Sequence, residues 1–320
     1  MNRDEFPSMN PAYNRCFRAG SLSLGLVAPL EAYERGAAPT MSRHLDLIQL
    51  ADELGYRAVW LRDIPFDDQG FGDVGQIYDP WVYLGLLGAA TRNIGLGIAS
   101  AILPLRHPAH VAKSAATVDQ LSGGRMLLGV ASGDRPAEYP AMNISFDERS
   151  DSFHQSFYYI RQAAASYPEF ESHRGSMNRH LDIIPKPFAT KIPMLITGYS
   201  QQSYEWLVRH GDGWINYPKN SKMQRKQIET WRSDRKALEL PNKPAIQPLY
   251  IDVVDERSHA LTPIHLGIRC NIPQLISYVR QAQENGVNHL IFNLRFNQAD
   301  ISSTLRLLAK DVLGIFHETS

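Results

Sequence analysis

A glycine and several hydroxyl side chains stand close together in one short segment of the sequence. Gly198 follows an apolar run, and Tyr199, Ser200 and Ser203 come directly after it, with the two serines three residues apart. Backbone N–H groups at the start of a helix, supplemented by hydroxyl groups, form a common binding site for phosphate. The segment therefore predicts a phosphate site where a strand leads into a helix. The alternative is that Ser200 caps the helix and serves only that structure.

A second polar segment follows another predicted strand. Ser132 and Arg135 lie on either side of Gly133, a residue type that permits close approach of the backbone to a ligand. Both are therefore candidates for contact with the same phosphate-bearing ligand. A salt bridge from Arg135 to Asp134 or Glu138 is an equally good interpretation of this segment.

Four more charged or titratable residues are candidates for contact with a substrate. Arg62 and Asp63 end a predicted strand, where an arginine could bind an anion and a carboxylate could hold a proton. Adjacent residues of a strand point to opposite sides, so we expect only one of the two to face a pocket. An ion pair that only shapes the loop is the alternative. His265 and Arg269 lie in the long segment Asp255–Asn271, either in a lid over a site or on a mobile surface loop.

The composition argues against several classes of function. The 33 basic and 33 acidic side chains balance to zero net charge, whereas surfaces that bind nucleic acid usually carry a basic excess. No uncharged stretch approaches the roughly 20 apolar residues of a membrane span. The eleven histidines show no ligand spacing, so no metal site is expected. Two cysteines, Cys16 and Cys270, and the charged first residues favour a cytoplasmic protein without a disulfide framework.

Strand and helix patterns alternate along most of the chain. Eight short apolar runs are each followed by a longer amphipathic stretch. This alternation predicts a parallel sheet connected by helices, and eight such units favour a closed (β/α)₈ barrel, also called a TIM barrel, over an open sheet. The predicted strands are Leu22–Val27, Ala58–Asp63, Ile94–Ala101, Arg125–Ala131, Met194–Thr197, Gly213–Asn216, Pro248–Val254 and His289–Leu294.

The chain shows no linker that would divide it into two domains. Residues 1–20 have neither periodicity and are predicted to form an irregular N-terminal arm, whereas residues 21–320 form a single barrel domain. Three segments exceed the usual length of connections and are interpreted as insertion loops. Ser132–Arg149 and Asp255–Asn271 follow strands and are candidate walls of a site at the C-terminal face of the barrel, while Tyr167–Ile192 would lie mostly on the opposite face.

One long stretch of the sequence is distinctive enough to suggest a family. It reads LPLRHPAHVAKSAATVDQLSGGRMLLGVASG (Leu103–Gly133) and closely resembles the bacterial luciferase-like flavin monooxygenases, a (β/α)₈ family. Two further segments, PMLITGYSQQSYEW (Pro193–Trp206) and HGDGWIN (His210–Asn216), are similar to the same family. The resemblance covers essentially Leu22 to Leu313 and implies flavin mononucleotide (FMN) as the cofactor.

The resemblance also assigns roles to individual residues. It implies that Tyr199, Ser200 and Ser203 hold the FMN phosphate. It further implies that the flavin ring rests against a bulge with a cis peptide bond between Ala99 and Ser100, where the alternative is an ordinary strand end.

Two positions depart from the luciferase pattern. Luciferase has an arginine where this chain has Ser132, and Arg135 is the candidate replacement for contact with the phosphate or the ribityl oxygens. Luciferase also has a Glu-His pair where this chain has Asp63 and Ile64, so the histidine that supports its oxygen chemistry is missing. Asp63 then remains as the polar group facing the ring, and Arg62 as a contact for an anion.

These features together predict an FMN-dependent oxidoreductase, in the form of a two-component monooxygenase that uses reduced FMN and O₂ on a small organic substrate. No dinucleotide-binding glycine motif opens a helix after the first strand, so a separate NAD(P)H:flavin reductase is the expected source of reduced FMN. The resemblance also allows hydride transfer with the deazaflavin coenzyme F420. The missing histidine allows a non-catalytic flavin-binding protein. The resemblance further implies a homodimer, with the helix Asp79–Thr91 as a candidate interface.

Overall fold

A computed structural model describes residues 5–255 and 260–316 of the chain. Its centre is a closed ring of parallel strands, because β9 pairs with both β8 and β12. The strands of this ring are β1 (Ser23–Val27), β2 (Ala58–Leu61), β3 (Gly95–Ile102), β4 (Met126–Ala131), β7 (Met194–Thr197), β8 (Gly213–Ile215), β9 (Ala245–Val253) and β12 (Val287–Asn293). The prediction of a (β/α)₈ barrel is confirmed.

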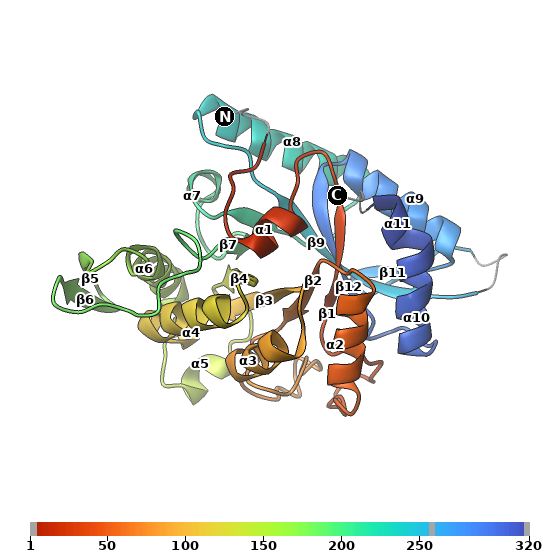
Figure 1. The fold of residues 1–320 in the computed structure, drawn as a ribbon, viewed down its shortest axis with the longest axis horizontal. Helices are drawn as coiled ribbons and strands as arrows, with labels where there is room; N and C mark the ends of the chain where they lie inside the picture. The colour runs from red at the N-terminus through yellow and green to blue at the C-terminus, as the bar shows by residue number, and fades with distance from the viewer. Residues whose placement is uncertain (1–4, 256–259, 317–320) are drawn as a thin grey trace.

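Each strand of the ring is followed by a helix on the outside of the barrel (Figure 1). These helices are α2 (His44–Glu53), α3 (Pro80–Ala90), α4 (Pro108–Leu121), α6 (Arg149–Gln162), α7 (Tyr204–Arg209), α8 (Ser221–Ala237), α9 (Ile272–Glu284) and α10 (Ile301–Leu308). The chain then continues through a π-helical turn, η2 (Ala309–Leu313), into α11 (Gly314–Phe316). No helix in the described ranges is both long and apolar enough to cross a membrane.

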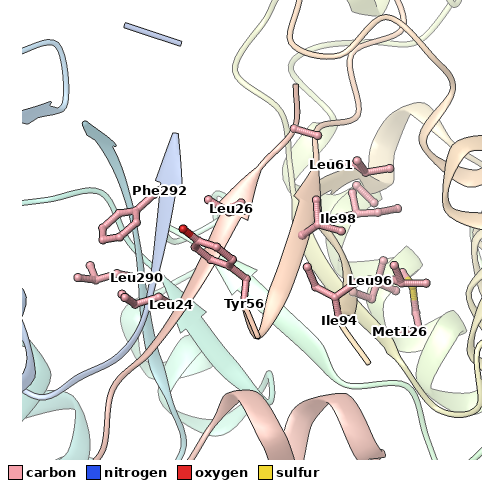
Figure 2. Packing of buried hydrophobic residues seen from close by; sticks show 14 of the residues in the cluster. Leu24, Leu26, Tyr56, Leu61, Ile94, Leu96, Ile98, Met126, Leu290 and Phe292 are labelled. Carbon is pink, nitrogen blue, oxygen red and sulfur yellow. The ribbon is translucent and has the colours of Figure 1, made fainter. Parts of the chain in front are cut away.

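The strands are apolar on both faces because each face is buried. Alternate residues point outward, beneath the helices, and form the larger core cluster of the protein. Figure 2 shows part of this layer, with Leu24 of β1 near Leu290 of β12, and Leu96 and Ile98 of β3 farther along the sheet.

The inside of the barrel is filled by large side chains that lie opposite glycines. A Cβ atom at Gly97 would overlap the ring of Trp60, and one at Gly25 would lie 2.6 Å from Nε2 of His289. Trp60 Nε1 donates a hydrogen bond to His289 Nε2 at 3.0 Å, so the neutral histidine carries its proton on Nδ1. That nitrogen donates to Ser23 Oγ at 2.6 Å. The barrel interior is therefore packed and hydrogen-bonded, and it forms a solid floor.

The N-terminal arm is not irregular throughout, which corrects the prediction for residues 1–20. Helix α1 (Pro11–Cys16) begins with Asn10, whose side chain accepts a hydrogen bond from Tyr13 N, and with proline in the first turn. Ala12 N donates to Gly124 O, immediately before β4, and Cys16 Sγ donates to Arg57 O, immediately before β2. The helix therefore covers the N-terminal end of the barrel (Figure 1). Six residues are too few to show a helical period, which is why the sequence pattern missed it.

Short elements occupy the three long segments. The first contains α5 (Glu138–Ala141). The second contains the hairpin β5 (Glu169–Ser172) and β6 (Gly175–Asn178), which packs against α6 through Tyr159 and Phe170. The third contains β10 (Thr262–Ile264) and β11 (Gly267–Cys270), while its residues 256–259 lie outside the described residues. A 3₁₀ turn, η1 (Leu103–Leu105), ends β3.

Candidate active site

A cavity of about 810 Å³ opens at the C-terminal ends of the barrel strands. Its size is typical of sites for a cofactor and a small ligand. Every strand of the ring contributes to its wall, and loops that follow most of these strands complete it. The strand residues in this wall include Val27, Trp60, Ala99, Ala131, Thr197, Ile215, Pro248 and Ile291.

The turn after β7 presents a row of backbone N–H groups to the cavity. Gly198, Ser200 and Gln201 have φ angles of 55°, 48° and 61°, so the backbone lies in the left-handed region at three of four positions. The N–H groups of Tyr199, Ser200 and Gln201 have no hydrogen-bond acceptor among the described residues. Successive N–H groups in a turn of this kind form a concave anion site. The predicted phosphate segment therefore lies in the cavity wall at Gly198, Tyr199 and Ser200.

Ser203 does not take part in this turn. Its Oγ accepts a hydrogen bond from Trp206 N at 3.1 Å and caps α7, and the residue is exposed and absent from the cavity wall. The predicted helix start at Ser200 is wrong, because the left-handed conformation at Ser200 and Gln201 cannot continue into a right-handed helix. Capping, which the sequence suggested for Ser200, belongs to Ser203, while Ser200 Oγ donates to Thr197 O at 2.9 Å.

The wall beside this turn is formed by the ends of β3 and β4. The peptide bond between Ala99 and Ser100 is cis, as predicted, and both residues line the cavity. Ser100 Oγ forms a hydrogen bond with Thr197 Oγ1, which joins β3 to β7. Ser132 also lines the cavity and is buried. The side chains at these lining positions are small, so the ends of β3 and β4 leave room for a ligand beside them.

Arg62 and Asp63 both line the cavity, so the expectation that only one of them would do so is wrong. Strand β2 ends at Leu61, and beyond it the chain no longer alternates between two faces. Asp63 accepts hydrogen bonds from Arg106 at 2.6 and 2.8 Å, one to each oxygen, and a further bond from Ile102 N at 3.2 Å. Both oxygens of the Asp63 carboxylate therefore accept hydrogen bonds, and these bonds fix the end of β3 and the residues that follow it.

Arg62 belongs to a charged network that the sequence did not indicate. Asp73 Oδ2 lies 2.6 Å from Arg62 Nη1 and 3.0 Å from Arg295 Nη1, and Tyr33 donates to Oδ1 at 2.8 Å. Burial raises the pKa of Asp73, but Arg62 and the hydrogen bonds outweigh that effect and lower it to about 2. The network fixes the loop after β2 against β12. Only the folded chain brings residues 62, 73 and 295 together.

Arg135 lies against the same loop and is not paired with Asp134 or Glu138 by a salt bridge in the described ranges. Its Nη2 donates to the carbonyl oxygen of Asp73 at 2.7 Å, and its guanidinium carbon lies 3.8 Å from the centre of the Phe71 ring. Glu138, which lines the cavity at the start of α5, is also buried. Burial raises the pKa of Glu138 to about 7 against the opposing effect of Arg135.

The two candidate substrate residues of the last long segment are separated in the structure. His265 lines the cavity, and its ring centre lies 5.8 Å from that of Tyr250. Arg269 lies opposite Asp252 in the pairing of β11 with β9, and the two form an ion pair at 2.9 Å. Arg269 is absent from the cavity wall and holds the hairpin to the barrel. No group of histidine, cysteine and carboxylate side chains suited to a metal ion occurs in the part of the chain that was described.

A model of the luciferase-like monooxygenase family matches residues 22–262. The chain belongs to this family. Among curated members, an F420-dependent hydroxymycolic acid dehydrogenase from Mycobacterium tuberculosis is 32% identical over 174 residues, which are 52% of this chain and 46% of that protein. A 4-hydroxyprotoasukamycin monooxygenase from Streptomyces nodosus subsp. asukaensis is 30% identical over 118 residues, 37% of this chain and 30% of that protein. The chain thus matches about half or less of the length of these relatives.

Solved structures of luciferase-like proteins share the fold over nearly the whole chain. A monooxygenase from Streptomyces bottropensis has a TM-score of 0.76 at 18% identity, covering 92% of this chain and 100% of that one. An F420-dependent secondary alcohol dehydrogenase has a TM-score of 0.73 at 15% identity, covering 91% and 98%. The oxygenating constituent of 3,6-diketocamphane monooxygenase from Pseudomonas putida, in complex with FMN, has a TM-score of 0.69 at 14% identity, covering 92% and 98%. The family therefore contains both oxygenases and F420-dependent enzymes.

The cavity wall above β2 contains one apolar and one paired acidic residue next to each other. Ile64 lines the cavity directly after Asp63. A hydrocarbon side chain cannot exchange a proton, and the neighbouring Asp63 is held by Arg106.

Proposed function

We propose that this protein is an FMN-dependent oxidoreductase, in the form of a two-component monooxygenase that uses reduced FMN and O₂ on a small organic substrate. The observation that carries this proposal is the row of N–H groups at Tyr199, Ser200 and Gln201, which have no acceptor among the described residues and lie in the same cavity as the small residues Ala99 and Ser100. One molecule of FMN would fit both features, with its phosphate on these N–H groups and its flat ring against the small residues.

Bound FMN would supply the redox chemistry, and the chain would supply position and exclusion of water. The N–H groups of the turn after β7 would hold the FMN phosphate, and Ser132 would contact the ribityl chain of FMN. Trp60, Ile64, Phe71 and Phe296 give the rest of the cavity apolar surface. That surface suits an organic substrate, and we propose that it excludes water from the reacting atoms.

The proposal includes two partners. A separate NAD(P)H:flavin reductase would supply reduced FMN, since the chain has no motif for a dinucleotide. A second copy of the chain would pack on α3. Val82 and Leu86 on this helix are 77% and 46% exposed, and Ile77 and Tyr78 just before it are about half exposed. Apolar side chains gathered in this way are typical of an interface.

F420 is the second candidate cofactor, because a dehydrogenase that depends on F420 is among the curated relatives with 32% identity. The N–H groups of the β7 turn would serve the phosphate of either coenzyme. In that case the reaction would be hydride transfer without O₂. A protein that binds flavin and catalyses nothing is the third possibility.

The test is an anaerobic titration of the protein with reduced FMN, reduced F420 and reduced riboflavin, followed by rapid mixing with O₂. We expect FMN to bind more tightly than riboflavin by at least about 100-fold, because riboflavin lacks the phosphate. We also expect oxygen to react with the bound FMN. Selective binding of F420 would favour the dehydrogenase, binding of FMN without any oxygen reaction or product would favour the non-catalytic protein, and binding of neither would contradict the proposal.

A further inference from the structure

Arg62 of the cavity wall has one pair of N–H groups for which the described residues offer no acceptor. Its Nη1 lies 2.6 Å from Asp73 Oδ2, whereas Nε and Nη2 donate to no described residue. Neither of these two nitrogens is one of the fully buried atoms that lack a partner, so both have accessible surface. The side chain as a whole is 21% exposed. Because Arg62 lines the cavity, a ligand in the cavity can reach this edge of the guanidinium.

A second arginine shows which group such an edge binds. Arg106 Nε and Nη2 donate to the two oxygens of Asp63 at 2.8 and 2.6 Å. The two N–H bonds on one edge of a guanidinium run parallel, and their spacing matches that of the two oxygens of a carboxylate. Arg62 presents the same two nitrogens to the cavity. A carboxylate is therefore the group for which this edge is suited.

The charges next to Arg62 also favour an anion. Asp73 Oδ2 lies 2.6 Å from Arg62 Nη1 and 3.0 Å from Arg295 Nη1, so one carboxylate serves two guanidinium groups. Arg35 lines the same cavity and forms no ion pair with a described residue. This part of the wall therefore carries more positive than negative charge.

The other acidic residues of the wall have cations of their own nearby. Asp63 is paired with Arg106. Asp134 and Glu138 follow β4 and interact electrostatically with Arg135. The excess of positive charge at Arg62 is thus left for a ligand to balance.

Two neutral donors come from neighbouring strands of the ring. Tyr250 of β9 and Asn293 of β12 are partners in the parallel pairing, and both line the cavity. The described residues provide no acceptor for the Tyr250 hydroxyl or for Asn293 Nδ2, and both atoms have accessible surface. Asn293 is only 6% exposed, and its Oδ1 accepts a hydrogen bond from Arg295 N at 3.0 Å. That bond fixes the side chain, and the accessible NH₂ group lies on the cavity side.

The Tyr250 hydroxyl is close to Arg62 and keeps its proton. Burial raises the pKa of Tyr250, and Arg62 is the charge that opposes this rise most. The hydroxyl therefore stays protonated at neutral pH and can donate a hydrogen bond. Phe296 gives an apolar surface beside it, with its ring centre 5.2 Å from that of Tyr250.

We propose that Arg62, Tyr250 and Asn293 bind a carboxylate group of the substrate. This inference rests on the proposed function and narrows the small organic substrate to a carboxylic acid. The two carboxylate oxygens accept hydrogen bonds from Nε and Nη2 of Arg62, and Tyr250 and Asn293 donate to the remaining lone pairs. The carbon skeleton of the acid lies on the apolar wall at Phe296.

The carboxylate site and the turn after β7 lie on opposite sides of the cavity. In the ring, β7 is three strands from β2 in one direction and three strands from β12 in the other. One anionic group on the N–H groups of the turn and another on Arg62 therefore occupy separate places. The cofactor and the acid can bind at the same time.

The first experiment compares two acids with their amides. Calorimetry measures the binding of benzoate, benzamide, hexanoate and hexanamide to the FMN-loaded protein at neutral pH and low ionic strength. Each amide has nearly the shape of its acid but no charge. We expect the wild type to prefer at least one acid over its amide by roughly ten-fold, because hydrogen bonds to a charged group are stronger. Equal binding of acid and amide in both pairs, or binding of none of the four, overturns the inference and leaves the proposed function untouched.

The second experiment repeats these measurements on variants that keep the contacts of the fold. Arg62→Lys keeps a positive charge beside Asp73 but lacks the paired N–H groups, and we expect the preference for the acid to fall by about five-fold. Asn293→Asp keeps the oxygen that accepts from Arg295 N and replaces the NH₂ group by a negative charge. We expect this variant to prefer the amide, because like charges repel.

Two further variants complete the set. Tyr250→Phe removes only a hydroxyl, and we expect it to weaken binding of the acid by roughly three-fold or more without changing the melting temperature. Arg209→Lys changes an exposed arginine of α7 outside the cavity wall and is the matched control, which should keep the wild-type preference. A preference that survives both Arg62→Lys and Asn293→Asp overturns the inference, because the acid then binds elsewhere.

FMN titrations of the same variants separate the two proposals. We expect Arg62→Lys and Asn293→Asp to bind FMN within about two-fold of the wild-type affinity, a change too small to indicate a lost contact. If either variant loses FMN, the residue serves the cofactor and the inference is wrong. If the wild type itself does not bind FMN, the proposed function fails. The acids and amides measured without FMN then decide the inference, because substitutions at 62 and 293 leave the turn after β7 unchanged.

Discussion

The two ends of the barrel differ in what lies over the strands. At the N-terminal end, α1 covers the strands, and Asp212 lies among Arg161, Lys191 and Lys243. At the C-terminal end, a cavity is open, and the buried residues Arg135 and Glu138 lie in its wall. The difference teaches that one end of this barrel is closed by packing and ion pairs, whereas the other leaves room for a ligand.

Asp212 shows how a buried charge is paired at the closed end. The residue is 1% exposed, and one of its carboxylate oxygens accepts a hydrogen bond from Met194 N at 3.0 Å. Its carbonyl oxygen accepts one from Tyr13 of α1 at 2.8 Å. Burial raises the pKa of Asp212, but the positive charges of Arg161, Lys243 and Lys191 outweigh that effect and hold it well below its usual range. Through its carboxylate and its backbone carbonyl, Asp212 thus joins α1, β7 and the start of β8.

The largest effect is expected from removing this carboxylate. Asp212→Ala leaves buried cations without a partner, and we expect it to lower the free energy of unfolding by about 3–5 kcal/mol. Urea denaturation at neutral pH measures the change. Asp151→Ala, which removes an exposed carboxylate, is the control and should change stability by less than about 0.5 kcal/mol. Similar losses in the two variants would remove the distinction between the closed end and the surface.

A smaller loss of stability is expected from a substitution in the packed barrel interior, between the two ends. Gly97→Ala places a methyl group into the Trp60 ring, and we expect it to lower the free energy of unfolding by about 1–3 kcal/mol. Gly85→Ala, in α3, meets no atom within 4 Å and should be neutral or gain up to about 1 kcal/mol. Thermal denaturation of the pair measures the difference. Equal melting temperatures for Gly97→Ala and Gly85→Ala would mean that the barrel interior rearranges to accommodate the added methyl group.

The change expected at the open end has the opposite sign and depends on pH. The pKa of Glu138 is about 7 in the folded protein and near 4.5 in an unfolded chain. The folded state therefore binds the proton more tightly, so the wild type is favoured at low pH and loses stability as the pH rises from about 4.5 to about 7. Glu138→Gln lacks this loss. We expect its melting temperature to exceed that of wild type increasingly over this range and by a constant margin above it.

The reference for this last comparison is the same pair of proteins at pH 4, where Glu138 is neutral in both states. A melting-temperature difference that is independent of pH would show that Glu138 ionises as an ordinary surface carboxyl. The two ends of the barrel would then differ in their packing but not in the ionisation of a buried carboxyl at the open end.

Periodicity predicted the ring of strands but not the parts that close it. Runs such as Leu22–Val27 and Gly213–Asn216 are apolar because both faces of a barrel strand are buried, so their composition marks them in the sequence. Helix α1 is six residues long, and the hairpin β10–β11 is shorter still in each strand. Their places depend on contacts with distant residues, such as Tyr13 with Asp212, and no local pattern records such contacts.

The residues of the candidate site were likewise predictable from the sequence only in part. Gly198, Tyr199 and Ser200 could be found because a turn that binds an anion lies within one short segment. The structure places Ser203 apart from them, at the cap of α7, and a serine that caps a helix cannot be told from a serine in a phosphate turn by its neighbours in the sequence. Asp73 and Arg295 could not be found, because they meet only when β12 closes the ring. Glu138 was considered only as a partner of Arg135, and the burial that raises the pKa of its carboxyl is invisible in a sequence.

The short pairing between β8 and β9 decides how the hairpin β10–β11 reaches the cavity. Of the residues of β9, only Ala245 and Ile246 pair with β8, so the upper part of β9 is left to pair with β11. A Cβ atom at Gly267 would overlap the Tyr250 carbonyl, which makes this glycine the fixed point of attachment. The tip just before it places His265 and Leu266 in the cavity wall, and Tyr250 N donates to Leu266 O. One strand pair that ends early thus leaves the edge of β9 open for the segment that forms part of the cavity wall.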